Sequence, residues 1–139
     1  MNDSLQKSHF KFLNFEKAFN QLNYRLDVLK SNPEDEIVQT AVIQTFEFTF
    51  ELAWKLLKSF LEYKGIMVES YPRDIIKAAF QNNLISNGEI WLHALDDRNK
   101  TSHTYNANFA RQMVTRIIQD YQSIFAEIYK IIELEYDIR

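Results

Sequence analysis

Apolar residues recur at alternating steps of three and four along most of this chain, the spacing that places side chains on one face of an α-helix. One such row falls within residues 8–30, another within 35–63 and a third within 106–135. The rows are Phe12, Phe15, Phe19, Leu22, Leu26 and Leu29; Ile43, Phe46, Phe50, Ala53, Leu57 and Phe60; and Ala110, Val114, Ile117, Tyr121, Ile124, Ile128 and Ile131. We therefore expect three long helices that share one core.

The helix over 35–63 carries a second apolar row, and its apolar face is therefore too wide for a single neighbouring helix to cover. The second row is Val38, Val42, Thr45, Thr49, Leu52 and Leu56. This helix should be central or shared with a partner chain. Its opposite side carries Glu47, Glu51, Lys55 and Lys58, bordered by Trp54. That polar strip is either a solvated face or a support for residues near position 100.

Two shorter helices are expected between the long ones. A proline at the first position opens a helix over 72–83, and another runs from Gly88 or Glu89 to about Arg98. Their expected buried residues are Ile75, Ile76, Ala79 and Phe80, then Ile90, Trp91, Ala94 and Leu95. Gly65 is expected to close the long helix before them, and Asn106 to cap the last one.

Composition supports a helical fold. The 139 residues are 46% apolar, enough for one domain with its own core over 1–139. Only 2 Gly and 2 Pro leave little turn chemistry for β-hairpins. The prediction is an all-α fold, an antiparallel four-helix bundle with an additional short helix.

Charge and cysteine content limit the functional classes. The chain has no Cys, which removes disulfides and Cys-based zinc sites and fits a reducing cytoplasm. Its net charge of −3 gives no broad positive surface for duplex nucleic acid, so any RNA contact must be local or assembled by oligomerisation. The sequence lacks a membrane-length apolar run and a signal-peptide layout, so we expect a cytoplasmic protein without membrane contact.

The densest group of functional side chains is the octapeptide Arg98-Asn99-Lys100-Thr101-Ser102-His103-Thr104-Tyr105. Arginine can bind two phosphate oxygens at once, and histidine can exchange a proton with a ribose hydroxyl or a leaving oxygen. These groups suit a phosphate-bearing substrate. In a continuous helix Arg98 and His103 would lie about 140° apart, so they converge only if the helix ends or distorts near Ser102, or if a second copy completes the site.

Simpler structural roles for these residues stay open. Arg98 could pair with Asp96 or Asp97, and His103 could cap a helix end. His93 is expected to have an ordinary surface or packing role, and Arg111 and Arg116 are either exposed or add positive potential beside Arg98 and Lys100. No metal-binding spacing such as H-E-x-x-H occurs, so neither a metal nor another cofactor is expected.

Two blocks in order make the sequence recognisable. The block F-E-x-x-F-E-L-A-W-K over 46–55 is followed by Trp91 and by R-N-x-x-x-H-x-Y over 98–105. This combination resembles the nucleotidyltransferase substrate-binding proteins of the HEPN superfamily over nearly the whole chain, and it is more specific than either block alone.

The resemblance implies a HEPN-like helical bundle that forms a homodimer, or a higher oligomer, and pairs with a minimal nucleotidyltransferase. In related toxin–antitoxin pairs the HEPN member is a metal-independent ribonuclease toxin and the nucleotidyltransferase is its antitoxin. Residue by residue, Arg98 and His103 match the catalytic R-x4-H pair and Asn99 the polar residue that follows the arginine. Tyr105 matches the tyrosine that receives AMP groups and silences the toxin. Lys100 is expected to help Arg98 bind substrate.

Two further hypotheses remain. The chain could be a non-catalytic subunit of a nucleotidyltransferase complex, in which Arg98 and His103 only hold the phosphate of a nucleotide. It could also be a purely structural helical dimer, in which substitution of either residue has no effect.

Overall fold

The computed structural model describes residues 3–103 and 106–137, and within them every regular element is helical. In chain order the elements are α1 (Asp3–Ser31), α2 (Glu36–Tyr63), α3 (Pro72–Gln81), α4 (Gly88–Thr101), α5 (Ala107–Arg116), η1 (Ile117–Tyr121) and α6 (Gln122–Asp137). The last three follow one another without a gap, so they form one long helix with a π-helical turn, η1, in its middle. The sequence did not predict that turn.

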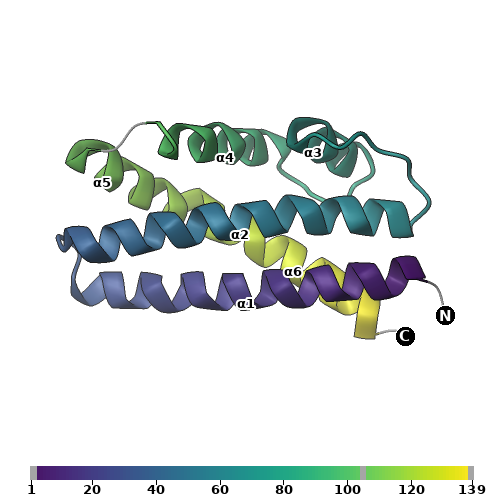
Figure 1. Cartoon of the computed structure of the whole chain (residues 1–139), viewed down its shortest axis with the longest axis horizontal. Helices are drawn as coiled ribbons and strands as arrows, with labels where there is room; N and C mark the ends of the chain where they lie inside the picture. The colour runs from purple at the N-terminus through teal and green to yellow at the C-terminus, as the bar shows by residue number, and fades with distance from the viewer. Residues whose placement is uncertain (1–2, 104–105, 138–139) are drawn as a thin grey trace.

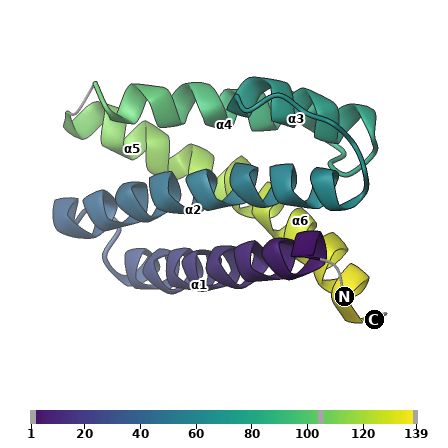
Figure 2. The same ribbon diagram turned by 45° about the vertical axis from the view of Figure 1, so that its right-hand side comes forward.

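The helices are arranged around α2. Figure 1 shows α1 and α2 side by side and antiparallel, with α3 and α4 on the other side of α2. The chain then turns at the end of α4, and α5, η1 and α6 cross behind α2 toward the two termini (Figure 2). The prediction of an all-α antiparallel four-helix bundle with one additional short helix, α3, is confirmed.

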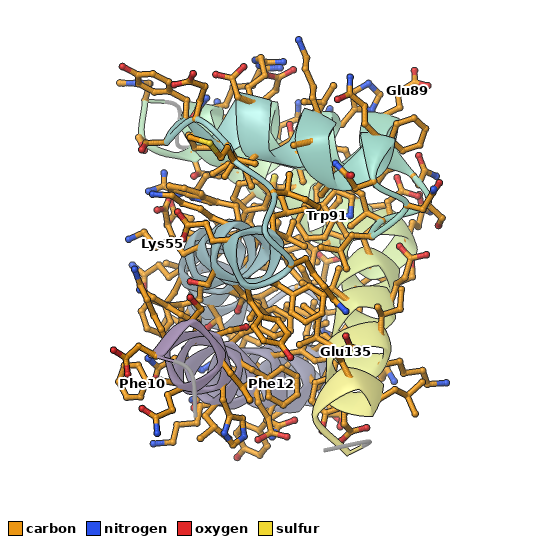
Figure 3. The ribbon with its side chains drawn as sticks, turned by 90° about the vertical axis from the view of Figure 1, so that its right-hand side faces the viewer. Phe10, Phe12, Lys55, Glu89, Trp91 and Glu135 are labelled. Carbon is orange, nitrogen blue, oxygen red and sulfur yellow. The ribbon has the colours of Figure 1, made fainter. Side chains whose placement is uncertain are left out.

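The apolar rows predicted on α1 and the first row predicted on α2 are buried, and one core connects all the helices. Trp91 of α4 lies at its centre, with ring centroids 6.0 Å from Phe50 of α2 and 5.9 Å from Phe125 of α6. Figure 3 shows Trp91 between these helices, and shows Phe12 facing α6 while Phe10 points away from the bundle. Trp91 therefore packs α4 against both α2 and α6.

Two residues expected in the core are at the surface. Phe80 is 51% exposed, because it lies in the last turn of α3, where its ring covers Gly88 at the start of α4. Ile131 is 38% exposed and Ile132 is buried in its place. The two residues that precede Ile131 in the predicted row, Ile124 and Ile128, are buried as expected.

The two capping residues predicted from the sequence, Gly65 and Asn106, are confirmed. The Asp35 carboxylate accepts hydrogen bonds from the first backbone N–H groups of α2, and the Asn106 side chain accepts one from Phe109 of α5 at 2.8 Å. Gly65 follows α2 with a φ of 83°, a left-handed conformation that glycine adopts without strain. Among the described residues, no helix combines the length and apolar character needed to cross a membrane.

Candidate functional site

The octapeptide begins in the last turn of α4. Asn87 caps the start of this helix by accepting a hydrogen bond from the N–H of Ile90, and α4 ends at Thr101 with Ser102 as its C-cap. The helix therefore stops inside the octapeptide, as required for Arg98 and His103 to converge within one chain. The cations Arg98 and Lys100 lie in this last turn, where they interact favourably with the negative end of the helix dipole.

The Arg98 guanidinium faces α2. Its Nη1 lies 3.7 Å from Glu47 Oε2 and its Nε lies 3.7 Å from Glu51 Oε1, and Nη1 donates a hydrogen bond to Ser102 Oγ at 3.0 Å. The Nε atom is buried and has no hydrogen-bond partner among the described residues. Since the two carboxylates are too distant for short hydrogen bonds, they orient Arg98 by charge and leave its guanidinium incompletely hydrogen-bonded.

The two glutamates are themselves held in place. Glu47 accepts a hydrogen bond from the Thr101 hydroxyl, and Glu51 accepts one from Trp54 Nε1 at 3.3 Å. The sequence left two interpretations of this polar strip, and the structure supports the second: Glu47 and Glu51 support the octapeptide. They reach it because α4 lies beside α2 (Figure 2), and Glu47 and Glu51 are on the side of α2 that contacts the end of α4.

The structure contradicts the alternative in which Arg98 pairs with Asp96 or Asp97. Asp96 pairs with Arg73 of α3 at 3.0 Å, and Asp97 pairs with Arg116 at the end of α5. Consecutive residues of a helix point about 100° apart, so these three side chains face three different neighbours.

The remaining predicted site residues face solvent or lie outside the described residues. Asn99, Lys100 and His103 are exposed. The backbone N–H of His103 donates to the carbonyl of Lys100 at 3.0 Å, which extends the last turn of α4. Between the side chains of Arg98 and His103 no contact is recorded within the described part of the chain. Tyr105, the predicted AMPylation site, lies outside the described residues.

A second polar group, which the sequence did not predict, lies on another side of α4, about 100° around the helix from Arg98. Asp97 is 6% exposed, and its carboxylate accepts two hydrogen bonds from the Arg116 guanidinium, at 2.7 Å from Nε and 3.2 Å from Nη2. The Tyr121 hydroxyl donates a further hydrogen bond to it. We call these three residues the Asp97 cluster. Both carboxylate oxygens are satisfied, as a buried charge requires.

The Asp97 cluster changes the acid–base properties of its members. Burial, together with the hydrogen bond to Asp97, raises the pKa of the Tyr121 phenol well above its ordinary value of 10.0. Burial alone would lower the pKa of the Arg116 guanidinium, but the hydrogen bonds and charge of Asp97 outweigh it and raise that pKa. Arg116 therefore stays charged and paired, and it is neither a free surface cation nor a source of positive potential beside Arg98.

One signal in the sequence could have revealed this cluster. Asp97 lies three residues after Ala94 and six after Trp91, on the apolar face of α4, where a carboxylate is too costly to bury without a partner. Its partners are Arg116, the residue before η1, and Tyr121 within η1. The sequence did not identify them, because the apolar spacing does not reveal the π turn that positions them.

Beside the cluster is a surface hollow of about 400 Å³ between α4 and α5, lined in part by His93, Lys100 and Gln112. His93 is exposed, in agreement with the surface role expected for it. Among the described residues, no group of three or more His, Cys, Asp or Glu side chains is placed to hold a metal ion.

Comparison with known proteins identifies related chains. Residues 10–133 match the model of a family described as nucleotidyltransferase substrate binding protein like. A Haemophilus influenzae protein named probable ribonuclease HepT is 31% identical over 112 residues, which cover 76% of each chain. The two sequence blocks that carry the resemblance, 46–55 and 98–105, both lie within the residues that match this family.

Solved structures share the fold. A Haemophilus influenzae protein described as a substrate binding domain of a nucleotidyltransferase superposes with a TM-score of 0.78 and 25% identity, over 88% of this chain and 98% of that one. A tri-AMPylated HEPN toxin of Shewanella oneidensis, solved with its MNT antitoxin, superposes with a TM-score of 0.74 over 96% and 99% of the two chains. At 18% identity this second likeness concerns the fold alone.

Proposed function

This chain belongs to the family of nucleotidyltransferase substrate-binding-like proteins, and from that premise we propose that it is a HEPN ribonuclease toxin controlled by a nucleotidyltransferase antitoxin. The observation that carries the proposal is the state of Arg98, whose guanidinium is oriented by Glu47 and Glu51 yet keeps a buried Nε donor without a partner. The relative named probable ribonuclease HepT supports the choice of reaction.

The proposed reaction is transesterification within RNA. The imidazole of His103 takes the proton of a ribose 2′-hydroxyl, whose oxygen attacks the adjacent phosphorus. The bond from phosphorus to the 5′-oxygen then breaks, and an imidazolium returns a proton to the leaving oxygen, giving a 2′,3′-cyclic phosphate and a 5′-hydroxyl. A positioned proton-transfer group of this kind contributes about 10²–10⁴-fold in rate.

The other residues of the octapeptide serve the phosphate. Arg98 stabilises the negative charge that develops on phosphorus oxygens, which is the role a guanidinium fork fits best. Lys100, exposed on the same turn, adds charge for substrate binding, and Asn99 orients the phosphate or His103. The site uses side chains alone, without a metal ion.

A homodimer completes this site in the proposal. Two octapeptides that face each other across a twofold axis double the local positive charge, which offsets the net charge of −3 on each chain. They also supply a second imidazole, so that one can act as base and the other as acid. Sedimentation equilibrium should then give a mass of about twice 16.6 kDa, and a monomer at catalytic concentrations would contradict this arrangement.

Silencing by AMPylation is the proposed control. Transfer of AMP from ATP to the Tyr105 hydroxyl, with release of pyrophosphate, would place bulk and negative charge two residues from His103, where RNA phosphate must bind. The partner enzyme is a minimal nucleotidyltransferase. The AMP groups on the structurally similar Shewanella oneidensis toxin support this idea.

Cleavage of a labelled single-stranded RNA in EDTA tests the ribonuclease. Wild-type protein should produce cyclic-phosphate ends, His103→Ala should reduce the rate by at least 10²-fold, and a substrate with a single 2′-deoxy residue at the cut should resist cleavage. His93→Ala, a change to another exposed histidine of the same region, is the matched control and should cleave normally. Equal rates for the two variants would refute the assignment of His103.

The alternative function is nucleotide binding without chemistry. In that case the wild-type protein binds ATP or AMP in calorimetry, Arg98→Ala weakens the binding, and no RNA is cut under any condition. The same observation about Arg98 motivates it, because an oriented guanidinium also suits a nucleotide phosphate.

Mass spectrometry after incubation with the partner nucleotidyltransferase and ATP tests the proposed silencing by AMPylation. One or more AMP groups should appear on the peptide that contains Tyr105, and Tyr105→Phe should remain unmodified. Tyr71→Phe, which changes a tyrosine that is 69% exposed, should still be modified. AMP on any other residue would overturn the assignment to Tyr105.

A further inference from the structure

We propose that Asp97, Arg116 and Tyr121 are positioning residues for Arg98: their buried contact fixes the rotation of α4 about its axis and so determines where the Arg98 guanidinium is presented. This inference rests on the proposed ribonuclease function and deepens it. None of the three residues touches the proposed substrate, since all act through the backbone of α4.

The first argument is adjacency. Asp97 and Arg98 are consecutive, so their side chains leave α4 about 100° apart at the same level along the helix. Asp97 faces η1 and the end of α5, whereas Arg98 faces α2. Any rotation of this turn of α4 that displaces one side chain must displace the other.

The second argument is the unequal quality of the two contacts. Asp97 is buried, and it accepts two hydrogen bonds from Arg116 and one from Tyr121. Arg98 is 25% exposed in its side chain and lies 3.7 Å from each of its two carboxylate partners. The well-bonded side therefore sets the position of the helix, and Arg98 follows.

The third argument is the π turn. Arg116 and Tyr121 are five residues apart, which in an α-helix would point them about 140° away from each other. The i→i+5 pattern of η1 stacks residues five apart, and both side chains then reach one carboxylate. The Tyr121 ring also stacks on Phe46 of α2, with centroids 5.3 Å apart, so it connects the cluster to the helix that holds Glu47 and Glu51.

The distances involved make such positioning important for rate. An arginine head about 6 Å from the helix axis moves by about 1 Å when the helix rotates by 10°. A misplacement of about 1 Å at a catalytic group can cost about 10²-fold in rate. Losing one contact of the Asp97 cluster can therefore slow the reaction without touching the substrate.

Kinetics of Tyr121→Phe test the proposal, because this variant removes one hydrogen bond and keeps the buried ring. Its matched control is Tyr129→Phe, since the Tyr129 hydroxyl donates to Glu16 and Glu133 on the α1–α6 side of the bundle. We expect kcat to fall about tenfold in Tyr121→Phe, with KM changed less than twofold, and both constants to be unchanged in Tyr129→Phe. Equal kcat values in the two variants would overturn the proposal.

A second readout does not depend on cleavage. Because the Arg98 Nε atom is buried, its proton should exchange slowly enough to give an NMR signal, assigned by its loss in Arg98→Lys. Tyr121→Phe should shift this signal and Tyr129→Phe should not; an unshifted signal in Tyr121→Phe would refute positioning. If wild-type protein cuts no RNA but the signal shifts as expected, the proposed function fails while the positioning inference stands.

If Tyr121→Phe does not fold, Arg116→Lys takes its place. Lysine keeps the charge beside Asp97 but loses the two-bond geometry of a guanidinium, so α4 should again be less well fixed. The expected result is the same pair of changes, a lower kcat and a shifted Arg98 signal. Their absence in a folded Arg116→Lys protein would overturn the proposal.

Discussion

The two sides of α4 near position 97 differ in how completely their charges are bonded. On the side facing η1, Asp97 and Tyr121 are buried, and the Asp97 carboxylate receives three hydrogen bonds. On the side facing α2, Arg98 is partly exposed, its ion pairs span 3.7 Å, and its Nε has no partner. Two adjacent residues of one helical turn thus have contrasting environments.

This difference separates stability from function. A fully bonded buried charge resists displacement, because removing one partner leaves the other unpaired in a medium of low polarity. An incompletely bonded, accessible guanidinium stabilises the fold less, but it can exchange its weak contacts for a phosphate at small cost. Substitution of Asp97 should therefore mainly lower the free energy of unfolding, whereas substitution of Arg98 should mainly lower the rate of cleavage.

The largest expected effect is on cleavage. Arg98→Ala should lower kcat by about 10²–10³-fold, because it removes the donor aimed at charge that develops in the transition state. The unfolding free energy should change by less than about 1 kcal/mol, as for other partly exposed ion pairs. Arg111→Ala, at an exposed arginine of α5, is the control for both measurements. A large loss of stability in Arg98→Ala would erase the distinction between the two sides.

The next largest effect is on folding. Asp97→Ala should reduce the unfolding free energy by about 3 kcal/mol in urea titrations, because it leaves the Arg116 guanidinium and the Tyr121 hydroxyl without their acceptor. Asp96→Ala is the matched control, since the neighbouring carboxylate forms an exposed pair with Arg73 and should contribute less than about 1 kcal/mol. Equal losses of unfolding free energy in the two variants would show that the Asp97 cluster stabilises the fold no more than an exposed ion pair does.

The fold could be predicted because its signals are local and repeated. Helix periods, the capping residue Asn106 and the scarcity of glycine all indicate the same bundle. The π turn could not be predicted, because the apolar row from Ile117 to Ile128 keeps its steps of three and four across it, and its members are buried. Within this turn, Tyr121 donates a hydrogen bond to Asp97 of α4, a contact between residues 24 positions apart in the sequence.

The candidate site was predictable in its residues and less so in its contacts. The octapeptide identified Arg98 and His103 from chemistry and family resemblance, and these roles stay predictions. The sequence did not favour the actual partners of Arg98, Glu47 and Glu51, because they are about fifty residues away in the chain. Asp96 and Asp97, which are adjacent in sequence, were the more obvious candidates. Only the packing of α4 on α2 decides between them.

A smaller effect should follow from removing one negative charge beside Arg98. Glu51→Gln keeps an acceptor for Trp54 Nε1 but no longer competes with phosphate for the guanidinium. Binding of an RNA oligonucleotide with an uncleavable 2′-deoxy residue, measured by fluorescence anisotropy, should become about threefold tighter, in line with the modest energy of a partly exposed pair. Glu62→Gln, at an exposed position of the same helix, should bind like the wild type. Weaker binding by Glu51→Gln would show that Glu51 organises Arg98 more than it competes.

The smallest effect at neutral pH concerns the protonation of Tyr121. Burial and the bond to Asp97 raise the pKa of this phenol in the folded protein above its unfolded value of 10.0. The neutral phenol therefore contributes stability that is fully present below pH 10 and is lost as the pH rises through the folded pKa. Above pH 10 the slope of unfolding free energy against pH should be shallower in Tyr121→Phe than in the wild type, by at most about 1.4 kcal/mol per pH unit. Absorbance at the phenolate band should lose one late alkaline step in this variant. If the slope and the alkaline titration are the same in the variant and the wild type, Tyr121 ionises equally well in the folded and unfolded states. The Asp97 side of α4 would then be no more closed to solvent than the Arg98 side.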